Sequence, residues 1–424
     1  MDPTRLVQRR ISRNGASLEI AVGPGVRLLR PVDRLWVAGA GKAAVAMAAA
    51  IAGLAPEVEG MVVAPQPPAS GRVGRIQVLA GDHPVPGPAT FRSTARILAR
   101  LVALPRDTTV LFLLSGGASA LFAAPAPGVT RADKVGLNVH LLRCGASIGV
   151  INAVRKHVSA VKGGGFALRA APREVLTLAL SDVPGDALAT IGSGPAVPDP
   201  STFGRALRAL RASDPGGAWV PQRIWRRLEA GASGAGPEET PKPADARLGR
   251  ASAALVGSNR TALAAAARAA RQWGYSVLPH RFSLHGEAAD CARAFAAALP
   301  RQVSKPLCVL GGGETTVTVG GAQGRGGRCQ ELALAAAAEI VGTGWSLLCA
   351  GTDGIDGLTD AAGAFCDGRT LSRGGHRRAA QALREHDSYP FFARLGDLFR
   401  PGPTGTNVMD ILVALHPGPA PRRA

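Results

Sequence analysis

The sequence predicts an α/β protein of two domains, and three observations support this prediction. Short apolar runs alternate with alanine-rich stretches of helical length, beginning with a strand candidate at residues 34–40 and a helix candidate at 42–51. Such alternation is typical of strands joined by crossover helices. The chain has 424 residues, which is more than one hydrophobic core usually serves. It is 46% hydrophobic and contains 54 glycines and 32 prolines, as expected for a folded protein with many tight turns.

The first domain is expected over residues 1–250. Further strand candidates lie at 60–65, 76–81, 109–116 and 175–182. Enough chain separates these runs for helices, which favours a largely parallel sheet. Residues 213–250 are expected to be partly linker, because the segment 217–251 is rich in Gly, Pro and Ala and its second half is typical of an exposed loop.

The second domain is expected over residues 251–424, again of the α/β class and with either a parallel or a mixed sheet. Its strand candidates are the runs at 254–259, 276–281, 307–314, 316–319, 345–351 and 411–416.

Composition argues against several classes of protein. No run approaches the roughly 20 apolar residues of a membrane span, and the first residues lack a secretory signal, so we expect no membrane partner and a cytoplasmic location. The formal net charge is +19, but Lys and Arg are scattered and only 4% of residues are aromatic, so no nucleic-acid partner is expected. The six cysteines lie far apart without a CxxC pair, which argues against zinc or redox work.

Two glycine turns directly follow strand candidates of the first domain. Small residues let the backbone approach a ligand, and a helix that begins there offers unpaired amides to an anion. Neither turn matches the GxxxxGK[ST] phosphate loop or the GxSxG nucleophile turn, and an ordinary tight turn is the alternative for both. The residues predicted to bind nucleotide or substrate here are Gly39, Gly41, Lys42, Ser115, Gly116, Gly117 and Ser119.

Acids and bases follow in the same domain. Asp182 and Asp186 flank a turn at a strand end, where they can hold Mg²⁺ or accept a substrate proton; helix capping is the alternative. Ser193 lies in the glycine-rich stretch that comes next. A helical segment also places basic and amide side chains near one face, for which a solvated basic face is the alternative. Its candidate ligands are Asn152, Arg155 and Lys156.

The second domain carries the densest anion signature of the chain. Residues 323–331 read QGRGGRCQE, and Arg325 or Arg328 can neutralise the charge of a transferring phosphate with a planar fork. The carboxylates of the DGIDGLTD loop do not follow the twelve-residue calcium-loop order, so an active-site loop is favoured. The other candidates are Glu314, Asp353, Asp356, Thr406 and Asn407, with Asp186 and Asp356 as candidate metal ligands.

Together these segments resemble the glycerate kinases of the MOFRL type, whose members are often labelled hydroxypyruvate reductases. The resemblance spans almost the whole chain. It rests on GAGKA, GDHPVP, LLSGGASALFAAP, INAVRKHVSAVKGG, LSDVPGD, IGSGP, PDPST, GGETTVTV, GRGGRCQELALA, GTDGIDGLTDAAGA and GPTGTNV.

The resemblance implies ATP-dependent phosphorylation of D-glycerate, commonly at the 2-hydroxyl, with Mg²⁺ or another divalent cation. It also implies a cleft between a larger Rossmann-like domain and a smaller C-terminal MOFRL domain at about residues 305–415, in a monomer or homodimer. Carried over, Lys42, Asp182, Arg325 and Arg328 become the expected catalytic residues, with Asp353 also near the site. Lys42 and the glycine turns would hold phosphates, and an arginine would stabilise the moving phosphoryl group.

The chain departs from the family pattern in places. Where GADIxEIN is usual it reads GASIGVIN, so Ser147 and Val150 replace two carboxylates, and Cys329 replaces an asparagine in GGRNQE. Two other functions therefore stay open. One is an NAD(P)H-dependent hydroxypyruvate reductase, although the GxGxxG fingerprint is missing. The other is a catalytically impaired protein that binds an anionic metabolite.

Overall fold

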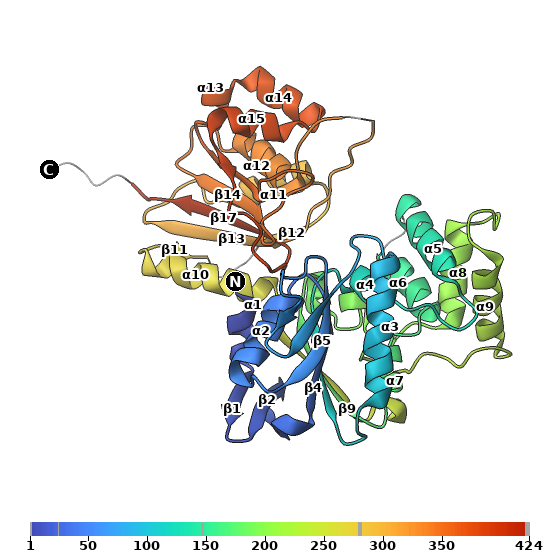
Figure 1. Cartoon of the computed structure of the whole chain (residues 1–424). Helices are drawn as coiled ribbons and strands as arrows, with labels where there is room; N and C mark the ends of the chain where they lie inside the picture. Colours follow the sequence, from blue (N-terminus) through green and yellow to red (C-terminus); the bar gives the residue numbers. More distant parts are fainter. Residues whose placement is uncertain (1, 24, 146–147, 279–281, 322, 420–424) are drawn as a thin grey trace. The chain divides into compact units, whose positions relative to one another are not determined.

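The computed structural model describes residues 2–23, 25–145, 148–278, 282–321 and 323–419. The chain divides into two compact units, Asp2–Val256 and Gly257–Ala424, called here the N-terminal and C-terminal units (Figure 1). Both contain a sheet covered by helices, which confirms the predicted α/β class.

The N-terminal unit is built on a seven-stranded sheet in the order β10-β9-β8-β4-β5-β7-β6. The five adjacent strands β9, β8, β4, β5 and β7 run parallel to one another, as the sequence predicted. All six residues of β4 and of β8 are buried, as expected for central parallel strands covered on both faces. The strands are β4 (Leu35–Ala40), β5 (Glu59–Ala64), β6 (Arg72–Val73), β7 (Ile76–Ala80), β8 (Thr109–Leu114), β9 (Glu174–Leu180) and β10 (Ala251–Gly257).

The order of these strands creates a switch point between β4 and β8. From β4 the chain builds the sheet outward through β5 to β7, then returns to the other side of β4 and continues through β8 to β9. In open sheets of this kind, ligands bind beyond the carboxyl ends of the strands where the winding reverses. That location is marked by Ala40 and Leu114, which pair with each other across the two strands.

Helices cover both faces of this sheet (Figure 1). On one face, α3 and α7 enclose a core that includes the rings of Phe112, Phe122 and Phe166, whose centroids lie 4.5–5.4 Å apart. On the other face α1 packs against α2. In the sequence α1 is followed by a small antiparallel sheet of β1, β2 and β3, which the sequence did not predict. These elements are α1 (Pro3–Gln8), α2 (Ala44–Leu54), α3 (Pro88–Ala103), α7 (Gly165–Ala170), β1 (Ile11–Asn14), β2 (Ser17–Gly23) and β3 (Val26–Pro31).

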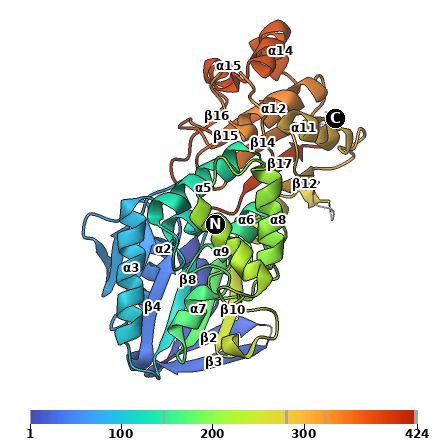
Figure 2. The same ribbon diagram turned by 90° about the vertical axis from the view of Figure 1, so that its right-hand side faces the viewer.

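A helical part of the N-terminal unit stands beside the sheet and has its own apolar core (Figure 2). Its helices are α5 (Arg131–Arg143), α6 (Ile148–His157), α8 (Phe203–Ser213) and α9 (Gln222–Ser233), while the short α4 (Ala118–Leu121) follows β8. The stretch after α9 is largely irregular, but it is not simply an exposed loop. The carboxylate of Glu239 accepts a hydrogen bond from the amide of Phe203 at 2.9 Å and lies 2.9 Å from Nε2 of His157, which ties the stretch to the helices.

The C-terminal unit contains a mixed sheet in the order β11-β13-β17-β14-β15-β16, with β12 also paired to β13. Here β17 runs antiparallel to both β13 and β14, so the carboxyl ends of β13 and β14 lie at the edge where β17 begins. The strands are β11 (Ser276–Val277), β12 (Phe282–Leu284), β13 (Leu307–Gly313), β14 (Ser346–Gly351), β15 (Gly363–Asp367), β16 (Leu398–Phe399) and β17 (Asp410–His416). The strand predicted at 316–319 was wrong: Thr316 makes only an isolated bridge to Glu287.

One helix packs on one face of this sheet and five lie on the other side (Figure 1). The helix on the first face is α10 (Asn259–Gln272), and the others are α11 (Ala288–Ala297), α12 (Arg328–Glu339), α13 (Thr370–Gly374), α14 (His376–Arg384) and α15 (Ser388–Leu395). Among the described residues of the whole chain, no helix has both the length and the apolar character needed to cross a bilayer.

The aromatic core under α3 yields a stability prediction. Phe112→Ala removes a ring that is fully buried between two others, so we expect the free energy of unfolding to fall by about 3–5 kcal/mol in a urea titration followed by circular dichroism. Val102→Ala, at an exposed position of α3, is the control and should change it by less than about 0.5 kcal/mol. Equal effects of the two substitutions would contradict the assigned core.

Candidate active site

The two predicted glycine turns meet at the switch point of the N-terminal unit. The amide of Ser115 donates to the carbonyl of Ala40 at 3.1 Å, and the amide of Lys42 donates to the carbonyl of Gly116 at 2.8 Å. The Ser115 hydroxyl accepts a hydrogen bond from the amide of Ala43 at 3.0 Å, just before α2 begins. The turns are therefore locked together, and Lys42 projects from their junction.

Glycine is required at two positions of these turns because other chain segments approach closely. A Cβ at Gly116 would overlap the carboxylate of Asp182, and a Cβ at Gly41 would overlap the Ser115 side chain. Gly41 also has φ +138°, which side-chain-bearing residues rarely adopt. The backbone of the turn after β8 thus lies directly against the acid that follows β9.

Asp182 is the acid that this geometry places at the switch point. Burial raises its pKa above the ordinary aspartate value, while the positive charge of Lys42 and the amide of Gly117 act in the opposite direction. The carboxyl group is therefore close to both turns and less acidic than an exposed aspartate. Asp186 lies four residues further on, at the end of a short 3₁₀ turn (Pro184–Asp186).

His83 belongs to the same group of residues, although the residue-by-residue analysis did not single it out. A Cβ at Gly117 would contact both its ring and the Lys42 side chain. Burial lowers the pKa of His83, and the charge of Lys42 lowers it further. The available signal was the GDHPVP segment, which follows β7 and so reaches the same edge of the parallel sheet.

A chain of side-chain hydrogen bonds leads from α4 to α6. The hydroxyls of Ser119 and Ser193 lie 3.0 Å apart, and Ser193 donates to Oδ1 of Asn152 at 3.0 Å. Three predicted ligands from separate segments are therefore in contact. Arg155, one turn further along α6, donates from Nε to Oδ1 of Asn138 at 2.7 Å.

Lys156 has a structural role instead of the binding role or the solvated face that we considered. Its side chain is buried, and Nζ lies 2.9 Å from Oδ1 of Asp199. Asp199 also accepts hydrogen bonds from the hydroxyls of Ser201 at 2.7 Å and Thr240 at 3.0 Å. The buried Lys156–Asp199 ion pair therefore secures the fold, because breaking it would leave an uncompensated buried charge.

In the C-terminal unit, the predicted residues gather where β13 and β14 end and β17 begins. Arg328, the first residue of α12, donates from Nε and Nη2 to both oxygens of the buried Asp410, at 2.6 and 2.9 Å. Its Nη1 lies 2.6 Å from the carboxylate of Glu314. Burial alone would lower the pKa of the Arg328 guanidinium, but the carboxylates of Asp410 and Glu314 raise it. The two carboxylates also hold the guanidinium in one orientation.

Asp356 caps the start of α12. Its carboxylate accepts hydrogen bonds from the amides of Cys329 at 3.1 Å and Gln330 at 2.8 Å, the unpaired donors of a helix N-terminus. Burial raises its pKa to about 6. These contacts give the carboxylate a task other than the predicted metal ligation, for which the structure supplies no support.

Arg325 lies in the glycine-rich loop before α12 and is exposed. Its guanidinium stacks on the Tyr389 ring at 4.0 Å from the centroid, and its amide donates to Asp387 at 2.8 Å. Within the described part of the chain, this guanidinium forms no ion pair with a carboxylate. A cavity of about 200 Å³ beside the loop is lined by Arg328, Glu331 and His386, among others.

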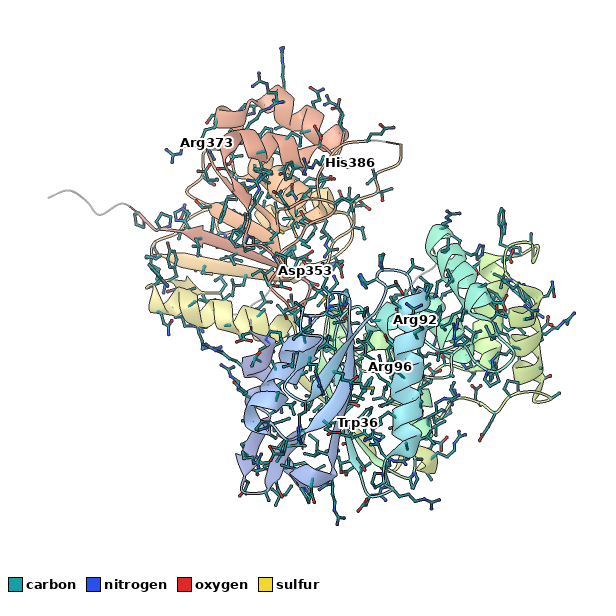
Figure 3. The ribbon with its side chains drawn as sticks, in the orientation of Figure 1. Trp36, Arg92, Arg96, Asp353, Arg373 and His386 are labelled. Atoms are coloured by element: carbon teal, nitrogen blue, oxygen red, sulfur yellow. The ribbon has the colours of Figure 1, made fainter. Side chains whose placement is uncertain are left out.

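The remaining candidates of this unit lie on two loops that are bonded to each other. The carbonyl of Asp353, which follows β14 (Figure 3), accepts a hydrogen bond from the amide of Thr404 at 3.2 Å. Thr406 is buried and its hydroxyl has no hydrogen-bond partner, whereas Asn407 accepts one from the amide of Met409 at 3.0 Å.

The described residues contain no group of three or more His, Cys, Asp or Glu side chains arranged around a metal ion. Mg²⁺ in nucleotide sites is usually held by one or two carboxylates and the phosphates. The ligand roles of Asp186 and Asp356 stay predictions.

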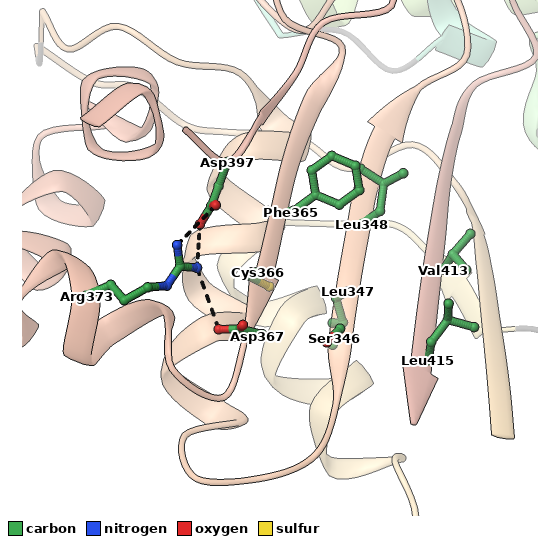
Figure 4. Close-up of a pocket in the computed structure, with 10 residues that line it drawn as sticks. All are labelled: Ser346, Leu347, Leu348, Phe365, Cys366, Asp367, Arg373, Asp397, Val413 and Leu415. Atoms are coloured by element: carbon green, nitrogen blue, oxygen red, sulfur yellow. Dashed lines mark hydrogen bonds and ion pairs between the residues drawn. The ribbon is translucent and has the colours of Figure 1, made fainter. Parts of the chain in front are cut away.

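Two larger hollows lie away from the predicted residues. One, of about 340 Å³, opens on the outer face of β14, β15 and β17, where apolar side chains such as Phe365 and Leu348 lie beside the Arg373–Asp397 ion pair (Figure 4). The other, of about 750 Å³, is lined by Trp36 and other residues near the amino end of β4, opposite the switch point. Neither contains a residue predicted from the sequence to bind a ligand.

The departures from the family pattern fall in different surroundings. Ser147 lies outside the described residues, and Val150 is a partly exposed residue of α6. Cys329 is buried in the core of the C-terminal unit beside Cys349, and burial raises the pKa of its thiol well above the usual value. The side chain of Cys329 therefore packs inward, and the backbone amide of this residue is what contacts Asp356.

The Arg328–Asp410 pair yields a second stability prediction. Arg328→Met leaves the carboxylate of Asp410 buried without its partner, so the free energy of unfolding of the variant should be about 3 kcal/mol lower in urea titrations. Arg293→Met, which breaks an exposed pair with Asp290, should cost less than about 1 kcal/mol. An Arg328 variant as stable as the wild type would show that the pair does not hold the loop.

Comparison with known proteins identifies the relatives of this chain. Residues 1–229 match the family model described as a domain of unknown function, DUF4147, and residues 307–410 match the MOFRL family. The D-glycerate 2-kinase of Thermotoga maritima is 40% identical, over 91% of each chain. A relative from Agrobacterium vitis with a provisional hydroxypyruvate reductase name is also 40% identical, over 91% of this chain and 88% of the other.

A solved structure agrees with these matches. The crystal structure of the Thermotoga maritima glycerate kinase superimposes with a TM-score of 0.80 at 38% identity, covering 90% of this chain and 91% of that one. Sequence and fold thus agree over both units, and the chain belongs to the glycerate kinase family of the MOFRL type.

Proposed function

We propose that the protein transfers the terminal phosphoryl group of ATP to a hydroxyl of D-glycerate, giving 2-phosphoglycerate. The observation that carries this proposal is the kinship with named glycerate kinases across both units, at 40% identity over 91% of the chain. The geometry at the switch point supplies the groups that such a transfer needs. Phosphoryl transfer depends mainly on positioning and on neutralising charge, so the arrangement of these groups matters more than any covalent chemistry.

The turns after β4 and β8 are proposed to hold the phosphates. Their glycines let Ser115, Asp182 and His83 pack directly against the backbone, and α2 begins directly after the first turn, with the partial positive charge of its amino end available to an anion. Lys42 adds a full positive charge at the junction. In this role the lysine binds the same phosphates in the ground state and in the transition state, as positioning groups do.

Asp182 is proposed to orient the attacking hydroxyl and accept its proton. Its carboxylate lies against the Gly116 backbone and close to Lys42, so a hydroxyl hydrogen-bonded to it would be beside the bound phosphates. Magnesium, held by the phosphates and one carboxylate such as that of Asp186, would neutralise phosphate charge. The raised pKa makes Asp182 a better proton acceptor than an exposed aspartate, because a base acts best when its pKa approaches the working pH.

The two arginines of the C-terminal loop differ in what they can offer. Arg328 is already engaged by Asp410 and Glu314, so we assign it to shaping the loop. Arg325 carries a guanidinium that stacks on Tyr389 and keeps its donors available. Arg325 is therefore the arginine proposed to stabilise the transferring phosphoryl group.

The activity is tested by coupling ADP release to NADH oxidation with ATP, Mg²⁺ and D-glycerate. We expect ADP formation with the wild type, and a loss of about 10²–10³ in kcat/KM for Lys42→Ala, because one charge-stabilising donor is removed. Lys305→Ala, at an exposed position of the C-terminal unit, is the matched control and should keep full activity. ³¹P NMR of the product identifies the phosphorylated hydroxyl.

An unchanged kcat/KM of the Lys42 variant would contradict the role of this lysine. Consumption of NADH with hydroxypyruvate in the absence of ATP and coupling enzymes, together with no ADP from D-glycerate, would instead identify a reductase. Ligand-induced thermal shifts without either reaction would identify a binding protein.

The role of Asp182 predicts a pH dependence. Since the pKa of Asp182 is raised, its carboxylate is protonated as pH falls, at pH values above those at which an ordinary aspartate is protonated. Wild-type kcat should therefore decline on the acid side through this protonation. Asp182→Asn should lower kcat by about 10²–10⁴ and remove that limb from the residual activity. An unchanged acid limb in the variant would assign the titration to another group.

Substitution of Gly116 tests the contact between the turn after β8 and Asp182 without changing Asp182 itself. Gly116→Ala places a methyl group where the Asp182 carboxylate lies, so we expect kcat to fall by about 10² through misplacement of the acid. Gly53→Ala is the control, because a Cβ there meets nothing within 4 Å and the residue lies inside α2. Equal activities of the two variants would contradict the assigned contact.

A further inference from the structure

Three buried or partly buried basic side chains interact electrostatically in the helical part of the N-terminal unit. Lys134 lies on α5, Arg155 on α6, and Lys162 follows α6. Lys134 is 1% exposed and Lys162 is 2% exposed. They are called here the cation cluster. The catalytic scheme proposed above uses none of them.

The contacts of the cation cluster leave it without a counter-charge. Lys162 donates from Nζ to the carbonyl oxygens of Ser119 at 2.9 Å, Gly192 at 3.3 Å and Phe122 at 3.5 Å, which are neutral, so it can offer a ligand its charge. Arg155 bonds to the Asn138 amide oxygen, which is neutral. Nζ of Lys134 is buried and has no hydrogen-bond partner. Within the described ranges, no carboxylate forms an ion pair with any of the three.

This arrangement is electrostatically costly. Burial, followed by the charge of Arg155, lowers the pKa of Lys134 to about 7. Burial and both neighbouring cations lower the pKa of Lys162 as well. Unpaired buried charges of one sign are strongly unfavourable, and a protein keeps them where something else offsets the cost. An anion bound among the three would do so.

Lys156 is a buried lysine of the same region with a structural role, and it differs from the cation cluster in its pairing. It lies next to Arg155 in the sequence, yet it pairs with the buried Asp199 at 2.9 Å. The fold therefore supplies a carboxylate partner for the ammonium group of Lys156. At the cation cluster no described residue provides such a carboxylate, which points to a ligand that brings its own negative charge.

Neutral hydrogen-bonding groups connect the cation cluster to the switch point. Ser119, whose carbonyl binds Lys162, is two residues beyond Gly117 of the second glycine turn. The hydroxyls of Ser119 and Ser193 and the side chain of Asn152 form the hydrogen-bonded chain described above. An acid bound at the cluster would thus lie close to the turn against which Asp182 packs.

We propose that Lys134, Arg155 and Lys162 form the subsite that binds the carboxylate of the small hydroxy acid, with Ser119, Ser193 and Asn152 beside its hydroxyls. This inference rests on the proposed function, since it names the residues that hold the acceptor. Phosphate is the other anion with suitable chemistry, but the glycine turns and Lys42 already provide for it. A carboxylate anchored at the cluster leaves the hydroxyl of the same small molecule free to approach Asp182.

The test uses Lys134→Met, which removes the charge and keeps a side chain of similar length. Without ligand, the variant should have an unchanged or higher melting temperature, because an unpartnered buried ammonium is lost. D-Glycerate alone should raise the melting temperature of the wild type and of the control Lys305→Met, but not that of Lys134→Met. ATP with Mg²⁺ should stabilise all three proteins equally.

Steady-state kinetics should likewise show an effect on D-glycerate and none on ATP. For Lys134→Met we expect the KM for D-glycerate to rise roughly 10- to 100-fold, as for the loss of one charged contact, with the KM for ATP unchanged. If Lys134→Met loses its native near-UV circular dichroism, Arg155→Met is measured by the same criteria.

Three outcomes would overturn the inference: no stabilisation of the wild type by D-glycerate, an unchanged KM for D-glycerate in the variant, or stabilisation by inorganic phosphate that depends on Lys134 while D-glycerate has none. Failure of the proposed function is a separate result. A wild type that releases no ADP, yet is stabilised by D-glycerate only when Lys134 is present, would refute the kinase activity and support the subsite.

Discussion

The pairing of β4 with β8 is the constraint on which the candidate site depends. These parallel strands are buried on both faces, so a one-residue shift in their register would move every side chain to the opposite face, where the packing is shaped for other residues. The pairing places Ala40 beside Leu114, and the bond from the Ser115 amide to the Ala40 carbonyl continues it into the turns. Two segments more than 70 residues apart in the sequence thereby lie side by side, and the chain after β9 brings Asp182 against them.

Charges inside the N-terminal unit follow two different rules. Where a buried charge supports the fold it has an opposite partner, as Lys156 has in Asp199. At the groups to which we assign function, the described residues either provide no opposite charge or do not restore the ordinary pKa. Asp182 has a raised pKa despite Lys42 nearby, and Lys134 has no partner for its ammonium group. Perturbed ionisable groups gather at functional sites because binding and proton transfer need charges that the protein itself has not neutralised.

The C-terminal unit uses capping and ion pairing to present a glycine-rich loop. Asp356 binds the amides at the start of α12, and a Cβ at Gly327 would overlap that carboxylate, so the chain can enter the helix there only through glycine. Arg328 is then held by Asp410 at the first residue of β17. With the loop anchored at its end, Arg325 remains at the surface on the Tyr389 ring, available to an anionic ligand.

The sequence by itself determined the α/β class, the parallel strands β4, β5, β7, β8 and β9, the glycine turns and the family, because buried runs, turn residues and motif order are local properties of the chain. It did not reveal β1–β3, whose short strands carry charged residues, and it wrongly predicted a strand at 316–319. Only the tertiary structure showed that Lys156 pairs with Asp199, that Asp356 caps a helix, that His83 lies beside Gly117, and that Nζ of Lys134 is buried without a hydrogen-bond partner. Those roles depend on partners that are distant in sequence, and on burial, which sets the free energy of each charge and is invisible until the chain is folded.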